Sequence, residues 1–184
     1  MRELSLHLLD IVQNSIAAEA DLIAIEILED SNDDQLIIKV TDNGRGMSES
    51  VLQSVIDPFF TTRKTRSVGL GLSLFAQTAQ RAGGDLVVNS QEGVGTEVKA
   101  VLQHSHIDRP PMGDLQGTLL TLIVLNPTID IVYRHNFDGR EFILDTREIK
   151  RELDGIPINH GQVVSWMQNF IQKGLAQLRG GRVE

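Results

Sequence analysis

The sequence has no cysteine, and only 4% of its 184 residues are aromatic. The absence of cysteine excludes disulfide bonds, thiolate metal sites and cysteine nucleophiles. With so few aromatic side chains, the core has to be aliphatic, and the 41% apolar content is enough to fill one. We therefore expect one full domain, or one domain with a smaller second one.

Long apolar runs are also missing, because none approaches the ~20 residues that cross a membrane. Near the N-terminus, Glu3, His7 and Asp10 interrupt the apolar positions, which is not typical of a signal peptide. These two absences predict a protein without a membrane segment and a cytoplasmic location.

Positive charge is in short supply, and the net charge is −8. Residues 1–104 contain 15 acidic and 8 basic residues, a net of −7, whereas residues 105–184 contain 10 and 9, a net of −1. An acidic chain repels phosphate backbones, so nucleic acid is not an expected partner. A nucleotide polyphosphate needs nearby cations, which Arg63, Lys64 and Arg66 supply.

The clearest break in the pattern lies at residues 105–116, where Pro110, Pro111 and Gly113 disfavour regular structure. We interpret this stretch as a linker between a domain at residues 1–104 and a small α+β region of unknown role at 117–184. Helices are predicted at 3–19, 48–56, 71–82, 147–153 and 161–178. Strands are predicted at 22–28, 36–41, 86–89, 96–103, 118–125, 129–134 and 141–144. The first seven elements predict an α+β sandwich, an open sheet covered by helices on one face.

Asp10 and Asn14 are four residues apart on the first predicted helix and so point to the same side. An amide oxygen is a suitable ligand for Mg²⁺, and a carboxylate one turn earlier can orient or deprotonate a water molecule. In isolation the pair also fits an ordinary polar helix face.

The segment Asp42–Met47 (DNGRGM) follows a predicted strand. Its glycines let a flat ligand approach the main chain, and a carboxylate at the strand end can accept a hydrogen bond from an adenine amino group. A simple turn is the alternative. An EF-hand loop is excluded because the required series of acids is absent.

Two further segments complete the set. Asp57–Thr62 (DPFFTT) predicts the start of a lid whose phenylalanines anchor it and whose following cations meet phosphates, although core packing also explains it. Val68–Leu72 (VGLGL) opens a helix, and free N–H groups at a helix start bind anions. It is neither a Walker loop nor a dinucleotide fingerprint.

Together the four segments resemble the GHKL superfamily of ATP-binding domains, shared by DNA gyrase, MutL and sensor histidine kinases, and most of all histidine-kinase catalytic domains. The resemblance covers residues 1 to about 103 and implies a Bergerat-type sandwich that binds ATP with Mg²⁺. By this resemblance Asn14 is the metal ligand, and the residues 93–96 (GVGT) form the last box, whose threonine helps to hold the adenine. The nucleotide-binding residues that it implies are Asn14, Asp42, Gly44, Gly46, Met47, Phe59, Phe60, Thr61, Thr62, Lys64, Gly69, Leu70, Gly71, Leu72 and Thr96.

Two departures from the superfamily pattern matter. Asp10, the predicted catalytic residue, stands where hydrolysing members and anti-sigma-factor kinases usually have glutamate. The sequence also begins at the helix of Asn14, so we expect no dimerisation segment with a phosphoacceptor histidine before it. His7 lies within that helix, and a phosphoacceptor role is not expected for it.

The function expected from these features is a cytoplasmic regulatory kinase or ATPase that binds Mg-ATP and acts on a protein partner in signal transduction. A slow ATPase that dimerises on binding ATP, and a module that senses ATP without turnover, are the alternatives. A homodimer is compatible with either. His104, His106, His135 and His160 show no metal-binding spacing.

Overall fold

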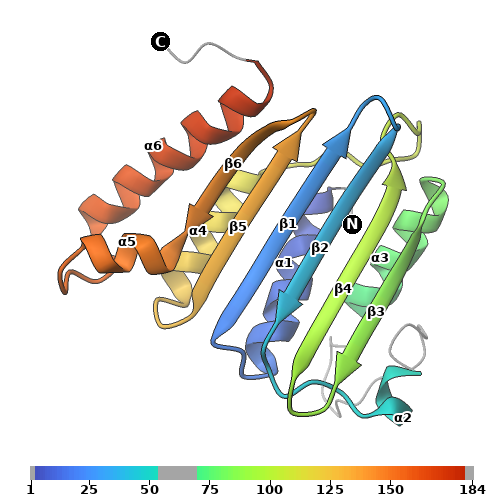
Figure 1. The fold of residues 1–184 in the computed structure, drawn as a ribbon, viewed down its shortest axis with the longest axis horizontal. Coiled ribbons are helices and arrows are strands. Elements are labelled where there is room, and N and C mark those ends of the chain that lie inside the picture. The colour runs from blue at the N-terminus through green and yellow to red at the C-terminus, as the bar shows by residue number, and fades with distance from the viewer. Residues whose placement is uncertain (1–2, 54–69, 181–184) are drawn as a thin grey trace.

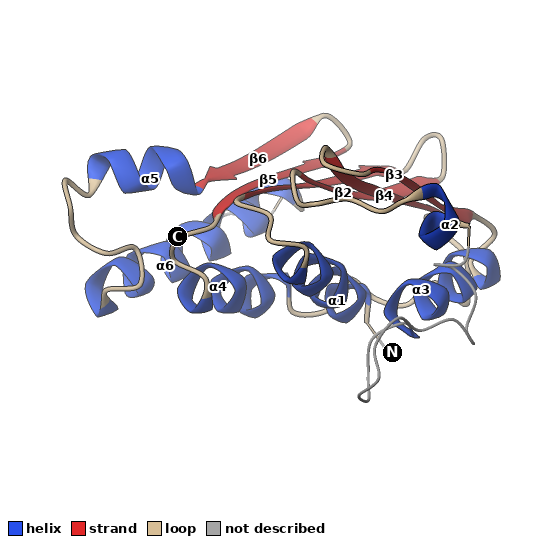
Figure 2. Ribbon diagram, turned by 90° about the horizontal axis from the view of Figure 1, so that it is seen from below, coloured by secondary structure: helices blue, strands red, loops and turns tan. Residues whose placement is uncertain are grey.

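The computed structural model describes residues 3–53 and 70–180 and has two layers (Figures 1 and 2). One layer is a six-stranded sheet with the order β3-β4-β2-β1-β5-β6. The other consists of α1, α3, α4 and α6, which lie on the same face of the sheet in Figure 2. The predicted open sheet with helices on one face is therefore confirmed. The strands are β1 Leu22–Asp30, β2 Gln35–Asp42, β3 Asp85–Gln91, β4 Gly95–Gln103, β5 Asp130–Phe137 and β6 Arg140–Asp145.

Alternating apolar residues explain the central strands. Ile23, Ile25 and Ile27 of β1 are at most 2% exposed, and the residues between them are more exposed. β2 shows the same alternation and pairs with β1 in antiparallel register, so that buried Ile25 lies opposite buried Val40. A sheet with one buried and one solvated face requires this period of two.

The helices bury apolar stripes against that face. The stripe on α1 consists mainly of Leu4, Leu8, Ile11 and Val12, all at most 3% exposed. α6 ends where the periodicity predicted, at Leu178. The helices are α1 Leu4–Ala17, α2 Glu49–Leu52, α3 Leu70–Arg81, α4 Leu115–Leu125, α5 Thr146–Glu152 and α6 Gly161–Leu178.

One predicted element has the wrong type. Residues 118–125 were expected to be a strand because they are apolar and rich in branched side chains, but they belong to α4. Leu115, Leu119, Leu122 and Ile123 are buried at helical spacing, and Asp114 caps the helix by accepting a hydrogen bond from Gly117 N at 2.8 Å. A short apolar run does not distinguish a buried strand from a buried helix, and the cap decides for the helix.

The C-terminal region extends the same sheet. β5 pairs with β1 in parallel register over eight residues, from Leu22 opposite Asp130 to Glu29 opposite Phe137. The irregular segment between β4 and α4 contacts α1, since Leu4 N donates to Pro111 O at 3.0 Å and Ser5 N to Met112 O at 2.9 Å. The described C-terminal residues, 117–180, are thus joined to the sheet rather than set apart from it. Their status as a separate domain stays a prediction.

Several predicted features cannot be compared with the structure. The described part of the predicted 48–56 helix is α2, and the DPFFTT segment, the lid and its cations lie outside the described residues. Among the described helices, none is long and apolar enough to cross a membrane.

Candidate nucleotide-binding site

The second half of α1 contacts two of the other site segments, the start of α3 and the end of β2. Gly71, in the first turn of α3, lies against Asp10: a Cβ atom on Gly71 would be 3.3 Å from Asp10 Oδ2. The predicted base and the predicted phosphate-binding helix start are therefore in contact. Burial raises the pKa of the Asp10 carboxyl above its usual value.

Asn14 lies one turn after Asp10 on the same side of α1, and both side chains are partly exposed. Within the described ranges, neither side chain has a hydrogen-bond partner. An unengaged amide oxygen beside a carboxylate is a donor set that suits Mg²⁺, which prefers oxygen ligands.

Asp42 is held in place at the end of β2. Its Oδ2 accepts a hydrogen bond from Ser15 Oγ at 2.6 Å, and its Oδ1 accepts one from Gly44 N at 2.9 Å. Ser15 is only 2% exposed, so this contact fixes the carboxylate against α1. Each carboxylate oxygen can accept a second hydrogen bond, and Asp42 therefore keeps acceptor capacity for a ligand.

Two glycines follow Asp42 because the chain passes very close to other backbone groups. A Cβ atom on Gly44 would lie 2.7 Å from Ala18 O, and one on Gly46 would lie 2.0 Å from Gln91 O. Gly46 also has a φ of +64°, which favours glycine. Between them, Arg45 N donates to Ala18 O at 2.9 Å and attaches the loop to the end of α1.

Thr96 lies directly opposite Asp42 in the β2–β4 ladder, so the two side chains share a face of the sheet. Ser90 Oγ contacts the Thr96 hydroxyl at 2.9 Å, donates to Gly95 O at 3.0 Å and accepts from Met47 N at 2.8 Å. Because the Ser90 hydroxyl donates its proton to Gly95 O, the Thr96 hydroxyl donates to Ser90 Oγ. The lone pairs of the Thr96 oxygen can then accept a hydrogen bond from a ligand.

The structure thus brings together Asp10, Asp42, Gly44, Gly71 and Thr96 along α1 and the adjoining strand ends. Met47 is attached to the same network through Ser90, and Leu72 is buried in the core. Leu70 is the first residue of α3. The remaining predicted residues lie outside the described ranges: Phe59, Phe60, Thr61, Thr62, Lys64 and Gly69.

A comparison with known protein families now decides the assignment. Residues 2–106 match the family described as "Histidine kinase-, DNA gyrase B-, and HSP90-like ATPase". The chain belongs to this ATPase family. Residues 2–106 are its ATP-binding domain, and the predicted superfamily membership is confirmed.

Relatives within this ATPase family include sensor kinases. The sensor histidine kinase ZraS of Salmonella typhimurium is 38% identical over 90 residues, which are 48% of this chain and 19% of the relative. ZraS of Escherichia coli K12 is 31% identical over 106 residues, 58% of this chain and 23% of the relative. Sporulation kinase E of Bacillus subtilis is 34% identical over 92 residues, 48% of this chain and 12% of the relative. The match therefore spans less than a quarter of each of these three proteins.

A solved structure supports the fold alone. The N-terminal domain of a DNA repair protein superposes with a TM-score of 0.54 at 16% identity, covering 79% of this chain and 53% of that one. The coverage extends beyond the 105 residues that match the ATPase family.

Sequence reasoning missed two residues of this candidate site: Ser15 orients Asp42, and Ser90 links the Met47 and Thr96 segments. Gly95, within the predicted last box, lets β4 approach Asp42, because a Cβ atom on Gly95 would lie 2.0 Å from the Asp42 carbonyl oxygen. Ser15 had a detectable signal, because it is a polar residue within the apolar stripe of α1. Ser90 had none, since its role depends on the β3–β4 register.

Two of the histidines, His104 and His135, converge on Glu29 near the C-terminal end of β1, away from the candidate nucleotide site. Glu29 is 4% exposed, and its two oxygens lie 2.8 Å from His135 Nε2 and 3.0 Å from His104 Nε2. His135 Nδ1 lies 2.8 Å from the Tyr133 hydroxyl. Burial tends to raise the pKa of Glu29, but the hydrogen bonds with the two histidines outweigh burial and lower it.

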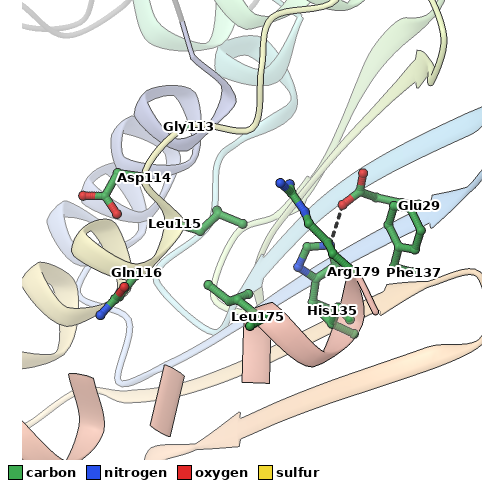
Figure 3. Close-up of a pocket in the computed structure, with 11 residues that line it drawn as sticks. Glu29, Gly113, Asp114, Leu115, Gln116, His135, Phe137, Leu175 and Arg179 are labelled. Carbon is green, nitrogen blue, oxygen red and sulfur yellow. Dashed lines mark hydrogen bonds and ion pairs between the residues drawn. The ribbon is translucent and has the colours of Figure 1, made fainter. Parts of the chain in front are cut away.

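A cavity of about 320 Å³ lies beside this cluster, between the start of α4 and the end of α6. Figure 3 shows the Glu29–His135 contact at one wall, with Arg179 beside it and Leu115 and Leu175 on other sides. Among the described residues, no group of three or more histidine, cysteine, aspartate or glutamate side chains is arranged to hold a metal ion.

Proposed function

We propose that this protein is a regulatory kinase or ATPase that uses Mg-ATP and acts on a separate protein. The observation that carries the nucleotide part is the position of Asp42. Ser15 and Gly44 hold its carboxylate, yet acceptor capacity remains on the face that it shares with Thr96. The kinase part rests on the relatives, which are named as sensor histidine kinases and a sporulation kinase.

The residues divide the work by chemistry. Asp42 accepts a hydrogen bond from the adenine amino group, which as a charge-assisted bond contributes about 1.5–3 kcal/mol. Thr96 adds a second acceptor next to it. Gly44 and Gly46 carry no side chains, so that a planar base can approach the backbone at these two positions.

The other end of the site receives the phosphates. Asn14 is the residue that would hold Mg²⁺, which when bound neutralises charge on the transferred phosphoryl group. The N–H groups in the first turn of α3, next to Gly71, would donate hydrogen bonds to phosphate oxygens. Asp10 acts as the base that orients or deprotonates the attacking hydroxyl or water. Burial raises its pKa toward neutral pH, where a general base is more effective.

A radiolabel experiment tests this proposal. The purified chain is incubated with γ-labelled ATP, Mg²⁺ and a soluble extract of the native cell, and label is followed into protein and into free phosphate. Transfer to another protein supports the kinase, and release of phosphate alone supports an ATPase. If no turnover occurs while calorimetry shows binding, the chain is an ATP-sensing module. If millimolar ATP does not bind at all, the proposal is wrong.

The protein partner is identified by capture from the same extract with the immobilised chain, with and without ATP. A partner that the kinase phosphorylates should be retained in a nucleotide-dependent manner and should carry the label in the transfer assay. Capture of the same proteins regardless of ATP would contradict a nucleotide-controlled interaction.

A further inference from the structure

His7 is a buried polar residue that the proposed chemistry does not use. It lies on α1, is 0% exposed, and its ring stacks on Phe75 of α3 with centroids 4.7 Å apart and an interplanar angle of 18°. Its Nε2 atom is 3.2 Å from Thr78 Oγ1, also on α3. Its Nδ1 atom is buried without a hydrogen-bond partner in the described part of the chain. A buried imidazole with one unpaired nitrogen costs stability.

The hydrogen bonds around Thr78 fix the tautomer of this histidine. The Thr78 hydroxyl donates its proton to Leu74 O at 2.8 Å, so its oxygen acts as an acceptor toward His7. His7 Nε2 must therefore be the protonated nitrogen, and the unpaired Nδ1 has a lone pair and no proton. Protonating Nδ1 would bury a charge with no acceptor, and burial accordingly lowers the pKa of His7 to about 4.

The neutral ring is one of the contacts that set α3 against α1. Asp10 follows His7 by one turn on α1, and Gly71 precedes Phe75 by one turn on α3. Asp10 lies against Gly71, just as His7 lies against Phe75. The two helices therefore run antiparallel, with His7 beside Phe75 and Thr78, and Asp10 beside Gly71. A donor on His7 that requires the Thr78 oxygen is directional, whereas an aliphatic contact would tolerate sliding or rotation of α3.

We propose that His7 is a positioning residue, which fixes α3 along α1 through Thr78 and thereby holds the phosphate-binding start of α3 beside Asp10. This inference rests on the proposed function, because it assigns the role of His7 to nucleotide binding. It also explains why a polar side chain occupies a buried position that leucine could fill. The directional hydrogen bond positions the first turn of α3, which contains Gly71, and the buried, unpaired Nδ1 atom lowers stability in return.

The test compares Mg-ATP affinity with stability in four variants of the full chain. His7→Leu removes the donor together with the unpaired nitrogen, and Thr78→Val removes the acceptor without changing the shape of the side chain. His7→Gln keeps an N–H donor, and Gln77→Ala changes an exposed neighbour of Thr78 as a control. Calorimetry measures the Kd for Mg-ATP, thermal unfolding measures Tm, and hydrogen exchange follows the amides of Leu72 and Ser73.

We expect His7→Leu to raise the Kd about tenfold, the effect of one lost positioning hydrogen bond. Its Tm should stay the same or rise, and the amides at the start of α3 should exchange faster. Thr78→Val should raise the Kd similarly, His7→Gln should recover most of the affinity, and Gln77→Ala should match the wild type. A purely structural role predicts the opposite, a lower Tm with an unchanged Kd.

Unchanged affinity in both His7→Leu and Thr78→Val would overturn the inference. If His7→Leu does not fold, Thr78→Val and His7→Gln still decide it. If the wild type fails to bind Mg-ATP, the proposed function fails. In that case hydrogen exchange at Leu72 and Ser73 still shows whether His7 fixes the start of α3, and unchanged exchange would refute that part as well.

Discussion

A single carboxylate carries the nucleotide assignment at the residue scale. Asp42→Asn keeps the shape of the side chain but replaces one acceptor oxygen by an NH₂ group and removes the charge. We expect the Kd for ATP to rise at least tenfold, about 1.4 kcal/mol, in calorimetry. Asp33→Asn makes the same change in an exposed turn at the opposite end of β2 and should leave the Kd unaltered. Equal affinity of the wild type and Asp42→Asn would remove Asp42 from the site.

Asp10 is expected to affect turnover rather than binding. Asp10→Asn should retain ATP affinity and lose about 10²-fold or more in hydrolysis or transfer, because a general base typically contributes 10²–10⁴-fold. Burial raises the pKa of this carboxyl, so the wild-type rate should fall on acidification at a higher pH than an exposed aspartate would give. The fall in rate on acidification is measured as the acidic limb of the pH profile of kcat/KM. Full activity in Asp10→Asn would show that the carboxylate is structural.

At the scale of elements, Glu29 connects β1 to His135 on β5 and to His104 just after β4. The hydrogen bonds lower the folded-state pKa of Glu29, so the stabilisation is present above its unfolded pKa, near 4.3, and is lost as the pH falls through the folded value. Glu29→Gln should lower the free energy of unfolding by about 1–3 kcal/mol at pH 7 in urea titrations. The difference from the wild type should shrink below about pH 4.

A second glutamate on the same strand provides the control for this prediction. Glu26 pairs with Lys39 at 2.6 Å, but both side chains are partly exposed, at 44% and 30%. Exposed ion pairs contribute at most about 1 kcal/mol, so Glu26→Gln should change stability little. An equal cost for both substitutions, or a cost for Glu29→Gln that does not depend on pH, would contradict a special role for the buried cluster.

The sequence predicted most elements because their signals are local. Alternation identified β1 and β2, and the stripe from Val163 to Leu178 gave the bounds of α6. The prediction failed at α4, where a continuous apolar run has no period that separates helix from strand. The convergence of His104 and His135 on Glu29 could not be predicted, because it depends on the ends of three strands meeting in space.

The site shows the same division. Asp42, Gly44 and Gly71 could be proposed from the sequence because their chemistry is tied to short segments, and the structure places them near α1; their role in binding stays a prediction. Ser15 and Ser90 were not, since their contacts cross from helix to strand or from strand to loop. Residue type indicates what a side chain can do, whereas the partner that orients it is set by the packing of distant segments.

At the scale of the whole molecule, the parallel pairing of β1 with β5 joins the C-terminal region to the central sheet and bears on whether the protein unfolds in one transition. Because the C-terminal strands continue the central sheet and α4 and α6 lie in the same helical layer as α1, residues 117–180 share a core with the ATP-binding domain. We therefore expect one cooperative unfolding transition. Trp166 on α6 is the only tryptophan in the chain, so its fluorescence reports on the C-terminal region alone.

Urea unfolding followed by Trp166 fluorescence and by far-ultraviolet circular dichroism should give coincident midpoints. The proposed Mg-ATP site lies around α1. Mg-ATP at 100 times its Kd should nevertheless move both midpoints together, by about 2.7 kcal/mol in the free energy of unfolding. Gln77→Ala, which changes an exposed side chain on α3, should behave like the wild type. If fluorescence changes first and ignores ATP, residues 117–184 unfold by themselves, and the division of the chain at residues 105–116 is a true domain boundary.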